Sequence, residues 1–247
     1  MPIVNLLRLL LVVAVIPGAS AAKLELASPV RQAALLELYT SEGCSSCPPA
    51  DRWLSQFKHD PRLWKNIVPV AFHVDYWNHL GWQDRFADAG YTQRQHRYKR
   101  YGYLGFVYTP GFVFNGREWR GWFERQGQPA TKLDNIGILK ATIDDNSVTA
   151  EFKPLRSLTS PLTLNIALLA FGQSSDVSAG ENRGKKLVHD FVVVDWRQFP
   201  QEAANDHYHW KLDGLPSQFP ANATGIALWI TATDDPTPLQ ATGGYLH

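Results

Sequence analysis

The sequence predicts an α/β fold for residues 23–135 and a β-rich, antiparallel, sandwich-like module for residues 136–247. In the first part, apolar strand-like runs alternate with segments whose apolar residues recur at helical spacing. In the second part, short alternating segments lie between clusters of Gly, Pro, Asn and Asp, which is typical of antiparallel sheets. These two patterns predict an α/β N-terminal domain with a β-rich C-terminal extension.

The α/β part is expected to begin with a strand over residues 33–40 (AALLELYT). A helix is expected over residues 50–57, where three large apolar residues have helical spacing. Residues 67–76 (IVPVAFHVDY) form a second apolar run, which predicts a buried parallel strand. A second helix is expected over residues 92–101, with a capping box at its start and Gly102 as its stop.

A β-hairpin is expected to follow this helix. Residues 109–116 (TPGFVFNG) combine a proline, a short apolar run and an Asn-Gly turn, and the second arm is expected over residues 117–122. Beyond residue 136 no segment has a comparably strong helical pattern. The strands expected there cover residues 147–152, 162–171, 187–194, 207–212 and 225–233.

Residues 1–22 predict a secretory signal peptide rather than a part of the fold. Residues 2–16 carry one positive charge, Arg8, and then an apolar run that is too short to span a bilayer comfortably. Small residues suited to cleavage follow at 19–22. The alternative is an uncleaved N-terminal anchor. We therefore expect a periplasmic or secreted protein without a membrane span once the signal is removed.

The charge balance argues against a nucleic-acid partner. The chain has 24 Lys and Arg residues against 23 Asp and Glu residues, a formal net charge of +1. Such a balance gives no general attraction to nucleic acid or to an anionic membrane. The helix expected over residues 92–101 contains Arg94, Arg97, Lys99 and Arg100, and a solvated face is the default expectation for them.

Cys44 and Cys47 are the two cysteines of the sequence, and they are three positions apart. A disulfide that closes so short a ring stabilises by only about 2 kcal/mol, less than a bridge between distant segments. Exported chains that rely on disulfides for stability usually carry several of them. A local structural staple remains the alternative. The spacing and the expected compartment favour redox chemistry.

Several stretches resemble the thioredoxin superfamily, in which a strand, a Cys-x-x-Cys pair at a helix start and a later Thr-Pro before a β-hairpin occur in this order. More closely, the chain is similar to an exported family catalogued as domain of unknown function 1223. The resemblance implies a thioredoxin-like fold for the N-terminal domain and no established substrate. It rests on LELYTSEGCSSCPPAD (36–51), FHVDYW (72–77), LGW (80–82), YTPGFVFNGR (108–117) and GENRGKKLVHDFVV (180–193).

The resemblance also implies roles for individual residues. Cys44 would be the exposed nucleophile and Cys47 the cysteine that resolves a mixed disulfide. Pro110 would follow a cis peptide bond, leaving the Thr109 backbone open to a bound peptide. An ordinary trans proline is the alternative. No cofactor is expected besides the redox-active disulfide itself.

The residues around the cysteines suggest how the pair is poised. Pro48 and Pro49 indicate that the helix begins only after Cys47, which weakens the help of its dipole to a thiolate. Glu42 and Asp51 lie close in sequence, and a nearby carboxylate opposes thiolate formation. We therefore expect a redox poise nearer to a reductant or an isomerase than to a strong oxidant.

Four further residues are candidates for proton transfer or substrate contact. Glu37 lies inside the first apolar strand, and a buried carboxylate there could shuttle a proton to the resolving cysteine. The alternatives for Glu37 are exposure to solvent or pairing with an arginine. His73, Asp75 and Trp77 fall at the end of the second strand, on the side where ligands gather in parallel sheets. Loop capping and ring packing are the alternatives for these three.

The sequence leaves three functions open. The first is a thiol–disulfide oxidoreductase acting on protein or small-molecule substrates with an unidentified redox partner. The second is a metal-handling protein, for example for copper, with Cys44, Cys47 and His73 as ligands. The third is a binding module without turnover. We expect no resident metal site, since no third ligand is evident even beside His207 and His209.

Overall fold

The computed structural model describes residues 23–130, 133–144, 147–202 and 207–246, so the expected signal peptide lies outside the described residues. The helices described are α1 (Pro48–Ser55), α2 (Ala89–Arg100) and the short 3₁₀ turns η1 (Gln56–His59), η2 (Asn78–Leu80) and η3 (Pro216–Gln218). The strands described are β1 (Leu24–Ala27), β2 (Ala34–Thr40), β3 (Ile67–His73), β4 (Gly111–Phe114), β5 (Arg117–Glu118), β6 (Gly137–Ile143), β7 (Ser147–Pro154), β8 (Leu162–Ala170), β9 (Gln173–Asp176), β10 (Lys186–His189), β11 (Val192–Gln201), β12 (Tyr208–Asp213), β13 (Gly225–Ala232) and β14 (Pro238–Tyr245).

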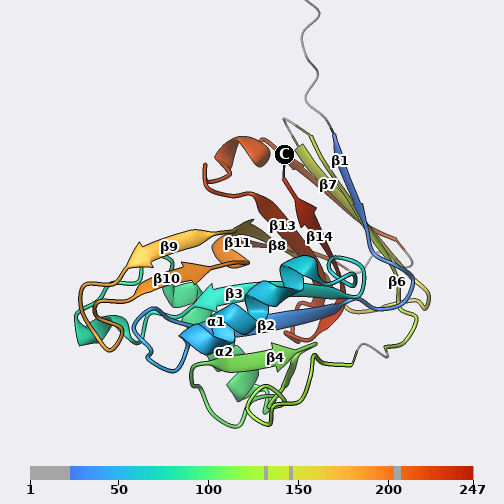
Figure 1. Cartoon of the computed structure of the whole chain (residues 1–247). Coiled ribbons are helices and arrows are strands. Elements are labelled where there is room, and N and C mark those ends of the chain that lie inside the picture. The colour runs from blue at the N-terminus through green and yellow to red at the C-terminus, as the bar shows by residue number, and fades with distance from the viewer. Residues whose placement is uncertain (1–22, 131–132, 145–146, 203–206, 247) are drawn as a thin grey trace, which may run out of the picture.

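Eight of the strands form one mixed sheet in the order β14-β13-β8-β11-β3-β2-β4-β5 (Figure 1). Strand β3 runs parallel to β2 on one side and to β11 on the other, and the remaining pairs are antiparallel. The β9–β10 hairpin forms a small sheet of its own beside α1. The chain is therefore mostly β-structure with two α-helices in its described part.

The expected thioredoxin-like α/β fold of an N-terminal domain is wrong for this chain. Strand β11 pairs with β3 through Val192 and Ala71, so the N-terminal strands do not close into a sheet of their own. The physical reason is that β3 would otherwise expose a row of unpaired backbone groups along one edge. Strands from the second half cover that edge and extend the sheet.

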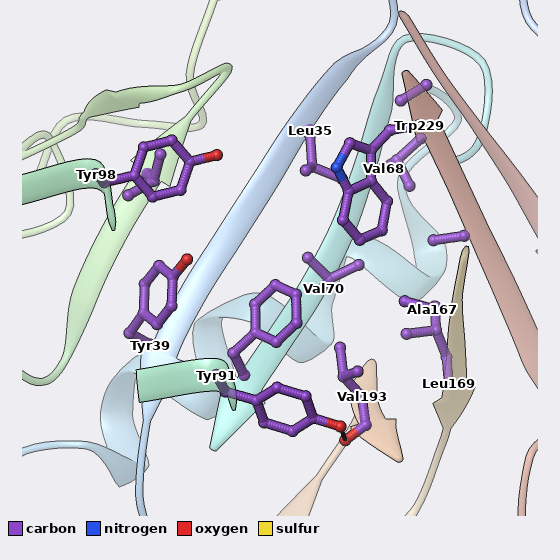
Figure 2. Packing of buried hydrophobic residues seen from close by; sticks show 14 of the residues in the cluster. Leu35, Tyr39, Val68, Val70, Tyr91, Tyr98, Ala167, Leu169, Val193 and Trp229 are labelled. Atoms are coloured by element: carbon purple, nitrogen blue, oxygen red, sulfur yellow. Dashed lines mark hydrogen bonds between the residues drawn. The ribbon is translucent and has the colours of Figure 1, made fainter. Parts of the chain in front are cut away.

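The buried core also combines residues from both halves of the chain. Tyr39 and Phe72 from the first half pack in one cluster with Val193 and Trp229 from the second half (Figure 2). These side chains are fully buried. Burying apolar surface contributes roughly 25 cal/mol per Å², so this shared cluster stabilises both halves together.

A separate antiparallel sheet, β1-β6-β7-β12, covers part of the large sheet. Its inward residues alternate along β6 and β7, and they pack against β8 and β13 in a second core. Strand β1 pairs with β6 from Leu24↔Ile143 to Ala27↔Lys140, so a strand from the first half completes this sheet.

The two α-helices lie on opposite faces of β2. Leu36 and Leu38 face the cluster that contains helix α1, and Leu35 and Tyr39 face the cluster that contains helix α2. The alternation of side chains along a strand produces this division. None of the described helices is long and apolar enough to cross a membrane.

Helix α1 starts where the sequence predicts, whereas helix α2 starts earlier than predicted. Helix α1 begins at Pro48 with Cys47 as its N-cap, as the double proline indicates. Helix α2 begins at Ala89, and its cap is Asp88, whose carboxylate accepts the Gly90 N–H, so the expected capping box at Thr92 is wrong. Gly102 follows α2 with φ +72°, a conformation that favours glycine.

Candidate functional site

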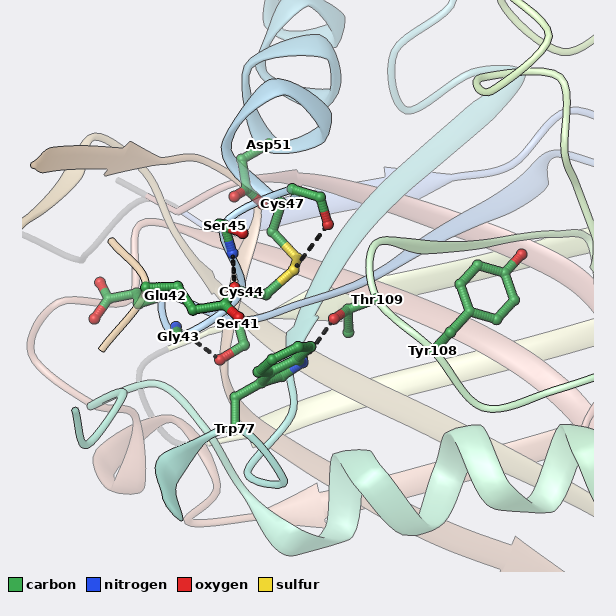
Figure 3. Close-up of a disulfide and its surroundings, with 12 residues drawn as sticks. Ser41, Glu42, Gly43, Cys44, Ser45, Cys47, Asp51, Trp77, Tyr108 and Thr109 are labelled. Carbon is green, nitrogen blue, oxygen red and sulfur yellow. Dashed lines mark hydrogen bonds between the residues drawn. A yellow bond between two sulfur atoms is a disulfide. The ribbon is translucent and has the colours of Figure 1, made fainter. Parts of the chain in front are cut away.

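Cys44 and Cys47 are joined by a disulfide in the loop between β2 and α1 (Figure 3). This loop, residues 41–47, is called the cysteine loop here. Their Cα atoms are 5.5 Å apart. Two successive turns shape the loop, because the Cys44 N–H donates to Ser41 O and the Cys47 N–H donates to Cys44 O, each at 3.2 Å. The sequence motif therefore folds locally into a closed ring at the start of the helix.

The disulfide lies just below the surface. Cys44 is 1% exposed and Cys47 is 0% exposed, whereas Ser45 and Ser46 between them are exposed. The Cys44 sulfur is 3.3 Å from Ser46 Oγ. The expectation of an exposed Cys44 is thus wrong for the disulfide form.

Trp77 connects the cysteine loop to the Thr109–Pro110 peptide bond, which is cis. Its indole Nε1 donates to Thr109 Oγ1 at 2.7 Å (Figure 3). A Cβ atom on Gly43 would lie 2.9 Å from Trp77 Cβ, so Trp77 leaves room only for glycine at this position of the loop. Because Gly111 pairs with Tyr39, Pro110 lies level with the end of β2. The structure thus brings Cys44, Trp77 and Pro110 to one end of the sheet.

The segment between β9 and β10, residues 177–185, fastens the cysteine loop and is called the strap here. Asn182, which is fully buried, donates from Nδ2 to Glu42 O at 2.8 Å and to Cys44 O at 2.9 Å. The Glu181 carboxylate accepts the Ser45 N–H at 2.9 Å. The strap therefore fixes the loop from the outside through backbone groups.

Replacing Asn182 with alanine is expected to lower the free energy of unfolding by about 1–3 kcal/mol, because two buried carbonyl groups lose their donor. The released loop should also let a small thiol reduce the disulfide faster. Urea unfolding and the rate of reduction by dithiothreitol measure the two effects. Arg183→Ala, an exposed change in the same strap, is the matched control and should alter neither. An unchanged reduction rate in Asn182→Ala would contradict the role of the strap.

A buried group of charged side chains lies behind the cysteine loop. His73 Nδ1 is 2.7 Å from Asp84 Oδ2, and both side chains are fully buried. Burial, the largest influence, would lower the pKa of His73, but the Asp84 carboxylate together with Asp51 and Glu42 outweighs it, and the pKa is raised. Burial alone would raise the pKa of Asp84, and the His73 charge and hydrogen bond keep that pKa below its ordinary value. The two groups therefore form an ion pair.

Glu42, Asp51 and His189 complete this group of charges. The His189 ring packs edge-on against the ring of His73, with centroids 4.9 Å apart. Glu42 accepts the Trp82 Nε1 proton at 2.8 Å, and its own N–H donates to the Asp84 carboxylate at 2.9 Å. The five side chains of this cluster are Glu42, Asp51, His73, Asp84 and His189.

Glu37 is not part of this site. Its carboxylate binds Arg94 in a bidentate pair, with Nε–Oε2 at 2.7 Å and Nη2–Oε1 at 3.0 Å. Glu37 points to the α2 face of the sheet, opposite to Leu36 and Leu38. Pairing with an arginine, one of the two alternatives for Glu37, is therefore what the structure shows. Arg94 is only 4% exposed, so the solvated face expected for the basic helix does not include it.

Asp75 also has a structural partner. Its carboxylate accepts the Thr92 hydroxyl proton at 2.6 Å, and its N–H donates to Thr92 Oγ1 at 3.3 Å. This pair ties the loop after β3 to helix α2, as in the loop-capping alternative. His73 is likewise engaged by Asp84, so of the four proton-transfer candidates only Trp77 contacts the cysteine and proline loops directly.

Within the described part of the chain, no group of three or more His, Cys, Asp and Glu side chains is arranged to hold a metal ion. The sequence reasoning missed Asp84, Asn182 and His189 as parts of the site. Two of them lie in the stretch at 180–193, whose family resemblance implies no role for either. The available signal is the polar pair His189 and Asp190, which interrupts the apolar residues 187–188 and 191–194.

The fold and the site define a mostly β-sheet protein whose Cys-x-x-Cys disulfide lies where a central strand enters its helix. The chain belongs to the family described as "Protein of unknown function (DUF1223)", whose model matches residues 35–231. No curated protein matches the sequence.

Two solved structures are similar to this chain. The X-ray crystal structure of protein AGR_C_4864 from Agrobacterium tumefaciens is 26% identical with a TM-score of 0.63, and the match covers 85% of this chain and 92% of that one. HBP35 of Porphyromonas gingivalis is 15% identical with a TM-score of 0.59, covering 89% of this chain and 76% of that one. At 15% identity, the similarity to HBP35 concerns the fold alone.

Proposed function

We propose that this protein is an exported thiol–disulfide oxidoreductase whose redox centre is the Cys44–Cys47 disulfide. The observation that carries the proposal is the disulfide itself: the two cysteines of the sequence are paired at a helix start, three residues apart. A ring of this size adds little stability, so chemistry explains the pair better than a structural staple does.

The reaction follows from thiol chemistry. In the reduced protein, the Cys44 thiolate attacks one sulfur of a substrate disulfide, and a mixed disulfide forms while the other substrate sulfur leaves as a thiolate. The Cys47 thiolate then attacks Cys44 Sγ and releases the second substrate sulfur. Two electrons pass to the substrate, which takes up two protons as a dithiol, and the protein is left with the Cys44–Cys47 disulfide.

Local structure supports a poise nearer to a reductant or an isomerase than to a strong oxidant. Cys47 is only the N-cap of α1 and Cys44 precedes the helix, so neither thiol lies within the first helical turn. The carboxylates of Glu42 and Asp51 are buried nearby and oppose thiolate formation. A Cys44 pKa below about 5, near the oxidant extreme, would contradict this poise.

The substrates proposed are protein or small-molecule thiols and disulfides, and an unidentified redox partner would restore the starting state. Because Cys44 is covered in the disulfide form, the partner must engage the exposed Ser45–Ser46 edge and displace the loop locally. The predicted signal peptide places the reaction in the periplasm or outside the cell. Metal handling has no comparable support, since in the described part of the chain no three His, Cys, Asp or Glu side chains are arranged to hold a metal ion.

Replacing Cys44 with serine is expected to reduce the rate of insulin disulfide reduction to the uncatalysed rate, because the attacking sulfur is lost. Cys47→Ser should instead accumulate the substrate as a mixed disulfide, visible by non-reducing electrophoresis. Ser174→Ala, a change at an exposed serine of β9 outside this edge, is the matched control and should keep both turnover and release. Equal rates in wild type and Cys44→Ser, or an empty trap with Cys47→Ser, would favour a non-catalytic binding module.

A further inference from the structure

His189 lies between two buried carboxylates. Its Nε2 atom is 3.3 Å from Glu42 Oε1, and its Nδ1 atom is 3.6 Å from Asp51 Oδ2. The side chains are 2%, 0% and 5% exposed, respectively, so solvent does not screen them. They come from strand β10, from the loop after β2 and from helix α1.

The two carboxylates flank the cysteines. Glu42 is two residues before Cys44, and Asp51 is four residues after Cys47. Residues four apart share one face of a helix, and the Asp51 N–H donates to Cys47 O at 3.1 Å. Figure 3 shows Asp51 on helix α1 beside the disulfide and Glu42 on the loop before it. Both carboxylates therefore belong to the segments that hold the two cysteines.

Each ring nitrogen of His189 faces one carboxylate oxygen, and none of these four buried atoms has a hydrogen-bond partner among the described residues. His189 is therefore the basic group placed to serve both carboxylates. Burial would raise the pKa of Glu42, but the neighbouring His189 is the foremost influence that brings that pKa below its ordinary value. Burial raises the pKa of Asp51, and the charge of His189 opposes the rise. His189 thus acts on both carboxylates.

Other charged groups around His189 are already paired. On strand β3, His73 contacts the His189 ring, and its charge is balanced by Asp84 from the following loop. The next residue along the chain, Asp190, pairs with Lys58 at 2.8 Å. Within the described part of the structure, His189 is therefore the basic side chain whose ring nitrogens face both Glu42 and Asp51.

We propose that His189 is a positioning residue for the Cys44–Cys47 couple: the basic side chain between Glu42 and Asp51 offsets their charges and so permits a thiolate beside them. The inference rests on the thiol–disulfide function proposed above. No proton or electron passes through His189 in the reaction, since its effect is electrostatic. Its removal should therefore make thiolate formation harder without removing a reacting atom.

The test is the pH dependence of thiol alkylation in the reduced protein. For His189→Gln we expect the midpoint of iodoacetamide reactivity to rise by at least about one pH unit, which is a tenfold smaller thiolate fraction below the midpoint. Asp51→Asn should shift the midpoint the other way. The double variant His189→Gln/Asp51→Asn should return close to the wild-type value, which a merely structural role of His189 would not produce.

His59→Gln is the matched control, because this histidine is exposed just beyond α1 and should leave the midpoint unchanged. A folded His189→Gln protein with the wild-type midpoint would overturn the inference, and so would a shift of equal size in His59→Gln. If His189→Gln does not fold, Asp51→Asn alone decides: an unchanged or raised midpoint overturns the inference.

The outcome is separable from that of the proposed function, because alkylation requires no turnover. A shifted midpoint in a protein without disulfide reductase activity would support the role of His189 and contradict the enzyme. Reductase activity with an unshifted midpoint would overturn the role of His189 alone.

Discussion

Replacing Arg94 with methionine is expected to lower the free energy of unfolding by about 3–5 kcal/mol, because it leaves Glu37 as an uncompensated buried charge. Glu37 is 0% exposed and lies on the central strand β2. After the change, the hydroxyl groups of Tyr39 and Tyr98 are what would remain, among the described residues, to bind its carboxylate. Urea unfolding of the oxidised protein measures the loss.

The Arg94 guanidinium also packs against four aromatic rings. Its guanidinium carbon lies 5.0–5.4 Å from the ring centroids of Phe72, Tyr98, Trp196 and Trp229. Methionine replaces the apolar stem but not this cation–π attraction. The predicted loss therefore combines the missing counter-ion with weaker packing in the core that joins the two halves of the sheet.

Two comparisons separate these causes. Arg100→Met makes the same change at an exposed position of α2 and should alter stability by no more than about 0.5 kcal/mol. Glu37→Gln/Arg94→Met removes both charges and should be more stable than Arg94→Met alone. A loss below about 1 kcal/mol in Arg94→Met would show that solvent or another group compensates Glu37.

Local signals in the sequence were sufficient for the elements around the cysteines. The apolar runs correspond to β2 and β3, and the double proline sets the start of α1 after Cys47. Because side chains alternate along a strand, Glu37 lies on the face of β2 opposite to Leu36 and Leu38. Its partner Arg94 could not be identified in advance, because nothing in a basic helix shows which arginine turns inward.

The arrangement of the sheet could not be predicted in the same way. Strand β11 joins β3 through the single pair Val192↔Ala71, and such pairing between distant segments leaves no periodic signal in either one. The run expected as one strand over residues 187–194 is divided between β10 and β11 by Phe191, whose φ is +58°. That break carries His189 to the cysteine loop while β11 enters the large sheet.

The Asp84→Asn substitution is expected to reverse the pH dependence that His73 gives to stability. In the wild type the pKa of folded His73 is raised above the unfolded value of about 6.5, so its contribution is complete below that pH and is lost as the pH rises through the folded pKa. The pKa of Asp84 is lowered, so its own contribution is lost only in acid, as the pH falls through its folded pKa.

Asparagine keeps the shape of the side chain and removes the charge. Burial, the largest influence on the pKa of His73, would then lower it below the unfolded value, against the weaker attraction of Asp51 and Glu42. Stability would be complete above about pH 6.5 and would be lost as the pH falls, which is the opposite slope. Near pH 6, where the wild-type pair is charged, the loss should reach about 3–5 kcal/mol.

The measurement is urea unfolding of the oxidised protein at several values between about pH 5.5 and 8.5, a window centred on histidine titration. Histidines outside the cluster contribute equally to both proteins, so the difference between wild type and Asp84→Asn reports on the cluster. His79→Gln, a change at an exposed histidine, should keep the wild-type slope, and His73→Gln should remove the difference. Parallel pH profiles for wild type and Asp84→Asn would mean that His73 is neutral in the folded protein, and the ion pair assigned to His73 and Asp84 behind the disulfide would be wrong.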